Sequence, residues 1–489
     1  MAFSPDIDRL NQIGIALSSE TNIDRLLDLI VTEARGFTRA DAGSLYTLEE
    51  DHLLFRIAQN DTLDSRAGGP SRFKPIPIPL DTRSIAGYVA LTGGVLHIED
   101  VYRITGEAPY SFNRSFDDES GYRTQSMLVI PMKEPEGRVL GVLQLINALG
   151  PQSRVIPFPE EFHDLALSLA SQAAVALRNA RLIAYIKSLF EALIKYSASA
   201  IDARSPHTAG HSRRVAEYSL LIAGEMDRQT EGPFAEVRFG PEDMERLSYA
   251  AWLHDMGKIG VPEEILDKRW RLPVGWEKVI ENRFALAGLC ASMAAGGDPA
   301  PREKLTGECR RVLAINSANF LGDEDRAFLE ELAVRTFLHP EGREESLLTG
   351  EEMTYLTIGR GNLTAEEYRT MQSHVEHTEK IVANIPFTGH LKDVPLIAAA
   401  HHEMLDGSGY PNKLSGNEIR IEARILAMVD IFDALTAMDR PYRKAAPPER
   451  ACEILRAEAK NGRLDPEVVE LFVTRRLWEG LDRTPRTSR

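Results

Sequence analysis

The spacing of apolar residues changes along the chain and divides it into regions. Residues 24–37 carry apolar positions at helical spacing, which predicts an amphipathic helix. Short strand-like runs follow, separated by turns rich in glycine and proline, at residues 43–48, 53–58, 95–98, 126–132 and 139–146. This order predicts an N-terminal α+β domain built on an antiparallel sheet with helices.

A long helix is predicted next. From Phe162, apolar residues recur in steps of mostly three or four, at Leu165, Leu169, Ala173, Ala176, Ala180, Ile183, Phe190 and Ile194. This seam resembles a heptad repeat. Either the helix packs on its own domain or it forms a parallel coiled coil between two protomers. We favour the coiled coil, and hence a homodimer through the N-terminal domain and this helix, because the seam runs past the sheet domain.

The remaining chain has a helical pattern, with histidines at intervals. This helical pattern is interrupted at residues 269–359, which are rich in glycine, proline and charged residues but retain helical segments such as 323–337. We therefore predict a helical insertion. The predicted fold is multidomain, with an α+β domain at 1–160, a connecting helix at 161–196, an all-α domain with the insertion at 197–480 and a disordered tail at 481–489.

Composition excludes several classes of function. The 489 residues contain 57 Lys and Arg against 73 Asp and Glu, a net charge of −16, which disfavours sequence-independent binding to nucleic acid. Three cysteines are too few for a disulfide framework. No apolar run approaches the roughly 18 residues of a membrane span, and the first residues do not have the pattern of a signal peptide. We expect a cytoplasmic protein without a membrane partner.

Side chains that bind metals gather in short clusters along the helical region. The histidines and aspartates concerned are His207, His211, His254, Asp255, His374, His401, His402 and Asp430. Imidazole and carboxylate suit divalent iron, manganese or zinc. A carboxylate can also bridge two metals, and metal pairs about 3.5–4 Å apart cleave phosphodiesters. Each cluster alone is weak evidence, whereas the ordered set points to a metal-dependent hydrolase.

The set resembles a known family. Residues 254–262, His-Asp-Met-Gly-Lys-Ile-Gly-Val-Pro, are similar to the signature of the HD superfamily of metal-dependent phosphohydrolases. Residues 401–411, which end in Gly-Tyr-Pro, resemble the second signature of the HD-GYP subgroup. The similarity covers about residues 194–471 apart from the insertion.

This resemblance implies a bacterial cyclic di-GMP phosphodiesterase that produces pGpG, with further cleavage to GMP left open. It implies two or three divalent ions, iron or manganese, on His211, His254, Asp255, His374, His401, His402 and Asp430. Lys258 would contact a substrate phosphate and act in catalysis with Asp255. Tyr410, Arg440 and Arg443 would bind the substrate.

His207 departs from the family pattern, in which an aromatic residue is usual and some members that resemble three-metal enzymes carry Glu. It is either a further ligand or a residue outside the ligand set. We favour ligation, because four residues along a helix place His207 beside His211.

The N-terminal region resembles GAF domains of cyclic-nucleotide phosphodiesterases and cyclases. The resemblance rests on residues 42–46, 84–89, 121–128 and 141–147 and covers about 8–179. Nucleotide-binding members carry Lys after the asparagine that aligns with Asn147, where this chain has Ala148. A small-molecule ligand is therefore implied without its identity, and a cyclic nucleotide, another small molecule and a purely dimerising role stay open.

Three functions compete. The first is hydrolysis of cyclic di-GMP under control of the GAF domain. The second is a cyclic dinucleotide receptor with little turnover, and the third is a phosphodiesterase for another cyclic dinucleotide. We rank hydrolysis of cyclic di-GMP first, because every ligand position is retained together with Lys258 and the Gly-Tyr-Pro segment.

Overall fold

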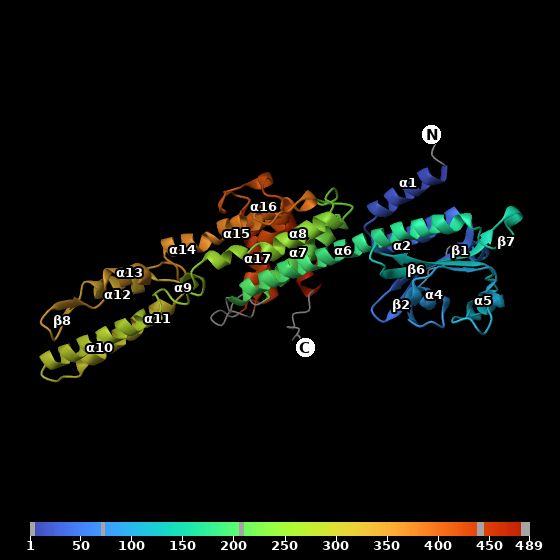
Figure 1. Ribbon diagram of the computed structural model, residues 1–489. Coiled ribbons are helices and arrows are strands. Elements are labelled where there is room, and N and C mark those ends of the chain that lie inside the picture. The colour runs from blue at the N-terminus through green and yellow to red at the C-terminus, as the bar shows by residue number, and fades with distance from the viewer. Residues whose placement is uncertain (1–4, 70–73, 205–209, 438–444, 481–489) are drawn as a thin grey trace. The chain divides into compact units, whose positions relative to one another are not determined.

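The structure is a computed structural model that describes residues 5–69, 74–204, 210–437 and 445–480 (Figure 1). Its first compact unit ends at Phe190 and its second begins at Glu191, both on helix α6 (Glu161–Arg204). Of the predicted site residues, His207, Arg440 and Arg443 lie outside the described residues, as does the predicted tail.

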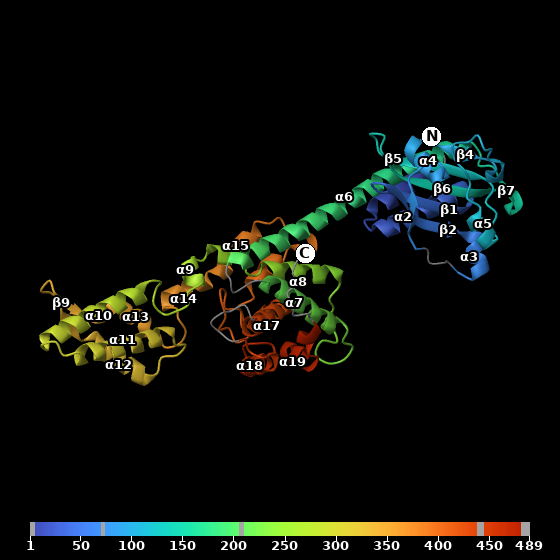
Figure 2. The same ribbon diagram turned by 90° about the horizontal axis from the view of Figure 1, so that it is seen from below.

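An antiparallel sheet forms the centre of the first unit, in the strand order β3-β2-β1-β6-β5-β4, with β7 paired to β6 (Figure 2). Its strands are β1 (Ala40–Leu48), β2 (His52–Asn60), β3 (Ile76–Pro79), β4 (Leu96–Ile98), β5 (Met127–Lys133), β6 (Val139–Leu149) and β7 (Val155–Ile156). The helices are α1 (Pro5–Ser19), α2 (Ile23–Thr38), α3 (Asp61–Ala67), α4 (Ile85–Thr92) and α5 (Ser115–Ser120). The predicted α+β domain on an antiparallel sheet is confirmed.

Helix α6 uses its predicted seam inside the first unit. Leu169, Ala173, Ala176 and Ala180 are almost fully buried in a core shared with α2 and the sheet. These four positions of the seam therefore pack within their own unit and not against a second protomer, because small alanines let the helix lie close to its own sheet, whereas Ile183 of the same seam is exposed. A different stripe is exposed, formed by Leu182, Ile186, Leu189, Leu193 and Tyr196.

The second unit is helical, as predicted for an HD region. Its helices outside the insertion are α7 (His211–Asp227), α8 (Pro241–Leu253), α9 (Glu263–Leu266), α14 (Ala365–Gln372), α15 (His374–Ala383), α16 (Val394–Ala399), α17 (Ile421–Thr436), α18 (Pro448–Lys460) and α19 (Pro466–Thr474). A short 3-10 helix, η3 (Met256–Gly260), follows α8. Among the described helices, none is long and apolar enough to cross a membrane.

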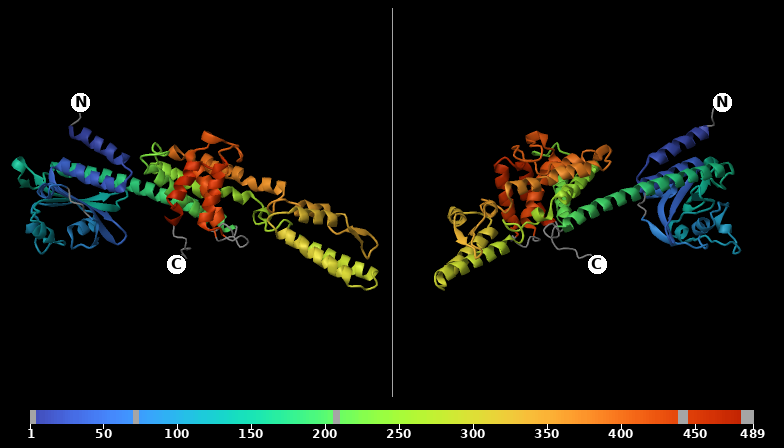
Figure 3. Two further views of the ribbon diagram at one scale, coloured as in Figure 1. Left: turned by 180° about the vertical axis from the view of Figure 1, so that it is seen from behind. Right: turned by 60° about the vertical axis from the view of Figure 1, so that its left-hand side comes forward.

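The insertion has an apolar core of its own, with buried side chains from Leu272 to Leu356. It contains α10 (Trp276–Ala294), α11 (Ala300–Ser317), α12 (Asp323–Ala333) and α13 (Gly350–Leu356), and Figure 3 shows α10 and α11 as the paired yellow helices. The helix predicted over 323–337 ends at Ala333, because β8 (Thr336–Leu338) pairs with β9 (Glu344–Ser346). The Asn362 side chain donates to the Lys268 carbonyl and ties the two ends together.

Candidate metal centre

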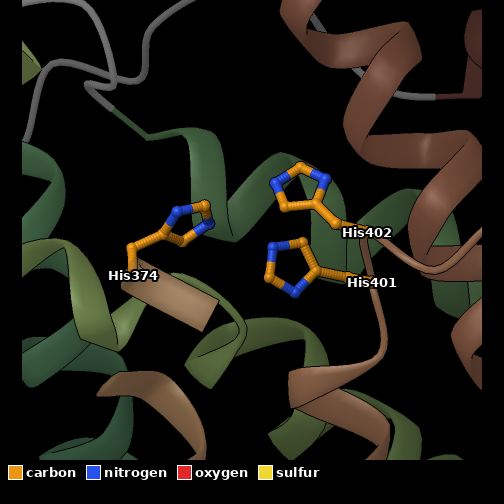
Figure 4. Close-up of side chains that lie close together, drawn as sticks. All are labelled: His374, His401 and His402. Carbon is orange, nitrogen blue, oxygen red and sulfur yellow. The ribbon is translucent and has the colours of Figure 1, made fainter. Parts of the chain in front are cut away.

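Five segments of the second unit bring the predicted ligands together. Four of these segments lie at helix ends: the first residue of α7, the link from α8 to η3, the first residue of α15 and the segment after α16. The fifth is the middle of α17. They contribute His211, His254, Asp255, His374, His401, His402 and Asp430. Figure 4 shows three of these histidines, His374, His401 and His402, with their rings gathered in one place.

Asp255 lies between two groups of imidazole nitrogens. Its Oδ2 is 3.3 Å from the Nε2 atoms of both His211 and His254. Its Oδ1 is 3.6 Å from His374 Nε2 and 4.0 Å from His401 Nε2. Each oxygen of this carboxylate therefore faces its own set of nitrogens, as expected of a carboxylate that bridges two metal ions.

Asp430 spans the site in the same manner as Asp255. Its Oδ1 is 3.3 Å from His211 Nε2, and its Oδ2 is 4.0 Å from His402 Nδ1. Sequence spacing did not reveal that this residue on α17 would meet the histidine that begins α7.

Backbone carbonyls orient three of the rings. Each Nδ1 donates to the carbonyl three residues earlier at 2.6–2.7 Å: His254 to Ala251, His374 to Met371 and His401 to Ala398. A neutral imidazole protonated at Nδ1 keeps a lone pair on Nε2. Such hydrogen bonds are the usual means of fixing a metal-binding tautomer.

Two of these Nε2 atoms have nothing to bind among the described residues. His374 Nε2 and His401 Nε2 are buried and lack a hydrogen-bond partner there. A buried polar atom normally has a partner, since leaving one unsatisfied costs about 1–3 kcal/mol. Lone pairs on buried nitrogens beside carboxylate oxygens fit a divalent metal ion.

The protonation of two of the histidines also suits metal binding. Burial, with the neighbouring histidines, holds the pKa of His401 well below its usual range. Burial lowers the pKa of His402 to about 4. Both rings are therefore neutral near pH 7, the form in which imidazole binds metals. Burial also acts to lower the pKa of His211, but three surrounding carboxylates outweigh it and raise that pKa.

Lys258 and Tyr410 lie beside these ligands. Lys258 is on η3, and its Nζ is 2.5 Å from Asp255 Oδ2. Burial lowers the pKa of Lys258, but the attraction of Asp255 is stronger and leaves it raised, so the ammonium is retained. The Tyr410 ring centre is 4.8 Å from that of His402.

Glu403 holds the loop that carries Tyr410. This buried carboxylate accepts from Asn412 N at 2.7 Å and from Leu414 N at 2.9 Å. Gly409 is required there, because a Cβ would lie 2.4 Å from Met404 N. The loop conformation is thus fixed from its interior.

Sequence reasoning missed two residues that support the ligands. Asp433 accepts from His211 Nδ1 at 2.8 Å and from Arg214 Nε at 2.6 Å. Its position three residues after Asp430 on one helix was a usable signal. Thr378 donates to the His254 carbonyl at 2.9 Å and accepts from Gly257 N at 2.8 Å, and no local pattern marks it.

Comparison with known proteins identifies domains in both units. A family model described as GAF domain matches residues 22–177, and two models described as HD domain match residues 208–290 and 318–468. The chain therefore contains a GAF domain followed by an HD domain, and an HD domain implies divalent metal binding. The solved GAF domain of an Acinetobacter phosphoenolpyruvate-protein phosphotransferase is 17% identical, with a TM-score of 0.28, over 37% of this chain and 99% of that one.

Several curated relatives are phosphodiesterases by name. The 3'3'-cGAMP-specific phosphodiesterase 3 of Vibrio cholerae is 28% identical over 57% of this chain and 37% of its own length. A probable cyclic di-GMP phosphodiesterase of the same organism is 34% identical over 58% and 44%. The cyclic di-GMP phosphodiesterase of Thermotoga maritima is 40% identical over 23% and 30%. The chain thus spans less than half the length of each of these relatives.

Proposed function

We propose that this chain, a GAF domain joined to an HD domain, is a metal-dependent phosphodiesterase for cyclic dinucleotides. The proposed substrate is cyclic di-GMP, cleaved to pGpG, with further cleavage to GMP left open. One observation carries the proposal: the two oxygens of Asp255 face separate groups of imidazole nitrogens, two of which are buried without a partner in the described chain.

The seven converging side chains would hold two divalent ions, iron or manganese. Bound there, the ions would supply Lewis acidity and an activated nucleophile at neutral pH. A third ion on His207 remains part of the proposal. Its test is the metal content of the His207→Phe variant after anaerobic loading, which we expect to fall from three ions to two.

The chain's own residues would position the substrate. Lys258 keeps its positive charge beside Asp255 and would bind a phosphate oxygen as negative charge develops on it. Tyr410 would pack against a base or ribose at the edge of the site. Arg440 and Arg443 would contact phosphate or guanine, for which a planar guanidinium is suited.

The relatives favour a second substrate, 3'3'-cGAMP, because one of them is named as specific for it. The decisive experiment is anaerobic purification, metal analysis and incubation with cyclic di-GMP and 3'3'-cGAMP separately. Hydrolysis of either supports the enzyme, and the ratio of kcat/KM identifies the substrate. Binding of both without hydrolysis by the metal-loaded protein would instead support a receptor.

We also propose a homodimer through the exposed stripe of α6 instead of the predicted seam. Leu182, Ile186, Leu189 and Leu193 alternate in steps of four and three, and each is at least 47% exposed. A stripe with this period pairs well with a second copy of itself. We expect the double substitution Ile186→Glu and Leu189→Glu to halve the mass in solution, whereas Ala184→Glu, on the opposite face, leaves it unchanged.

We propose that the GAF domain regulates turnover through α6. A cavity of about 330 Å³ in the first unit, lined by Arg83, Tyr110 and Arg114 among others, is a candidate for its small-molecule ligand. Substituting Ala184 and Lys187 by glycine weakens the helix by roughly 2 kcal/mol without changing its length. We expect the basal rate to change, whereas Lys187→Ala leaves it as in the wild type.

A further inference from the structure

The last turn of α6 contacts the segment that carries Lys258. Arg204, the final residue of the helix, donates from Nη1 to the Lys258 carbonyl at 3.1 Å and to the Ile259 carbonyl at 2.8 Å. Its Nη2 donates to the Val261 carbonyl at 3.1 Å. One guanidinium therefore binds three carbonyls at the end of η3.

These carbonyls lie at the end of a short helix, and that of Lys258 also accepts from Val261 N at 3.1 Å. A helix leaves its last carbonyls without intrahelical partners, and η3 is only five residues long. Arginine suits this place because its planar donors are fixed relative to one another and always charged. Hydrogen bonds from a charged donor are stronger than those between neutral groups.

Helix α15 also contacts η3. A Cβ on Gly257 would lie 1.8 Å from the His374 carbonyl, so the two backbones are in direct contact. Gly257 N also donates to Thr378 Oγ1. The helix η3 thus contacts both α15, which begins at a proposed ligand, and Arg204 of α6.

The same turn of α6 also contacts the start of α7. Asp202 is buried and accepts from Ser212 N at 3.0 Å and from Ser212 Oγ at 2.9 Å. Ser212 follows His211, and Gly210 at the helix N-cap has no side chain to accept these donors. Asp202 and Arg204, both in the last turn of α6, therefore support the start of α7 and the helix η3, which carry residues of the proposed metal centre.

We propose that Arg204 is the positioning residue for Lys258, holding its backbone so that Nζ reaches the substrate phosphate. This inference rests on the proposed function and deepens it, since it names where α6 acts on the site. Within the described ranges, the hydrogen bonds of Arg204 go to these three carbonyls and not to a ligand side chain, and Thr378 also holds η3. Loss of the guanidinium should therefore displace Lys258 while the metals remain bound.

The experiment compares Arg204→Gln and Arg204→Lys with the full-length wild type. We expect kcat for the better cyclic dinucleotide to fall roughly tenfold to hundredfold in Arg204→Gln, since a displacement near 1 Å has that effect. KM and metal content should stay near wild type. Arg204→Lys keeps the charge but loses the planar guanidinium, so its kcat should lie between those of the wild type and Arg204→Gln. Guanidinium added at low millimolar concentration should partly restore the kcat of Arg204→Gln.

The matched control is Arg213→Gln, because Arg213 pairs with Glu217 on the surface of α7 and loses the same charge. Wild-type kcat in Arg204→Gln, equal losses in both variants, or a loss that follows metal content would overturn the inference. Hydrogen exchange of a peptide spanning 255–261, expected to be faster in Arg204→Gln alone, needs no turnover. If the metal-loaded wild type hydrolyses neither dinucleotide, the proposed function is wrong. If hydrogen exchange of the 255–261 peptide is unchanged in Arg204→Gln, the positioning role is wrong.

Discussion

Both units bury a cluster of polar side chains, but only one cluster is complete within the protein. In the first unit, Tyr122 donates to Asp41 at 2.7 Å and accepts from Asn147 Nδ2 at 2.9 Å. The Asn147 oxygen accepts from Gln125 N at 2.7 Å. In the second unit, buried nitrogens of His374 and His401 find no such partner within the described ranges.

The difference separates a structural cluster from a binding site. Satisfied polar groups stabilise a fold and fix its geometry, and they have no capacity left for a ligand. The unpaired nitrogens of His374 and His401 differ from such groups because they converge on one carboxylate, Asp255. Convergence of unpaired groups is therefore better evidence for chemical function than burial of polar groups alone.

The largest effect is expected from a matched pair of substitutions. Asp255→Asn removes the charge that faces both nitrogen groups, so bound metal should be lost and hydrolysis reduced to background. Asp41→Asn makes the same change in the closed cluster and should leave metal content and kcat unchanged. Metal analysis and turnover of both purified variants test this, and full metal in Asp255→Asn would contradict the assignment.

Metal removal should act on one cluster only. A ligand at 100 times its Kd stabilises the folded state by about 2.7 kcal/mol. A chelator should therefore lower the unfolding temperature of the second unit, with faster hydrogen exchange near His401. Peptides around Tyr122 should exchange at an unchanged rate, and an equal change in both would show that the two clusters do not differ as proposed.

Asp433→Asn tests the support of one ligand. The substitution weakens the acceptor for His211 Nδ1 and so the ring's orientation. Substitutions of this kind reduce metal affinity or activity by about 10–100-fold. Titration of the metal-free protein with manganese measures the loss, and unchanged affinity would show that Asp433 does not orient His211.

Tyr122→Phe should give the smallest effect on function and a measurable one on stability. Removing the hydroxyl takes one hydrogen bond from Asp41 and one from Asn147, at a cost of about 1–3 kcal/mol. Denaturant unfolding of the first unit should show this loss, while kcat stays at the wild-type value. Tyr185→Phe, whose ring is exposed in the same unit, is the control and should change neither quantity.

Sequence patterns predicted the sheet, the helical second unit and the side chains that converge in it, because each depends on local spacing or short motifs. The residues that support the ligands were harder to find. Thr378 and Arg204 act on backbone atoms more than 50 residues away in sequence, as the separations in their hydrogen bonds show. No periodicity encodes such contacts.

The sequence did not show which apolar face of α6 is buried, for a related reason. Helix α6 carries apolar residues on two faces, and period alone does not say which face the protein's own sheet covers. The structure assigns Leu169 and Ala173 to the interior and leaves Leu182 and Ile186 exposed. Similarly, β8 and β9 are too short to be recognised without their partners.

The insertion lies between two groups of proposed metal ligands in the sequence, so the two groups are synthesised at different times. Asp255 is translated before the insertion, whereas His374 and Asp430 follow it. Chains fold domain by domain as they leave the ribosome. With its own core and its ends tied together through Asn362, the insertion can therefore fold before four of the seven proposed donors have been synthesised. The nascent chain thus carries a folded module beside an unfinished centre, which is completed only when α17 emerges.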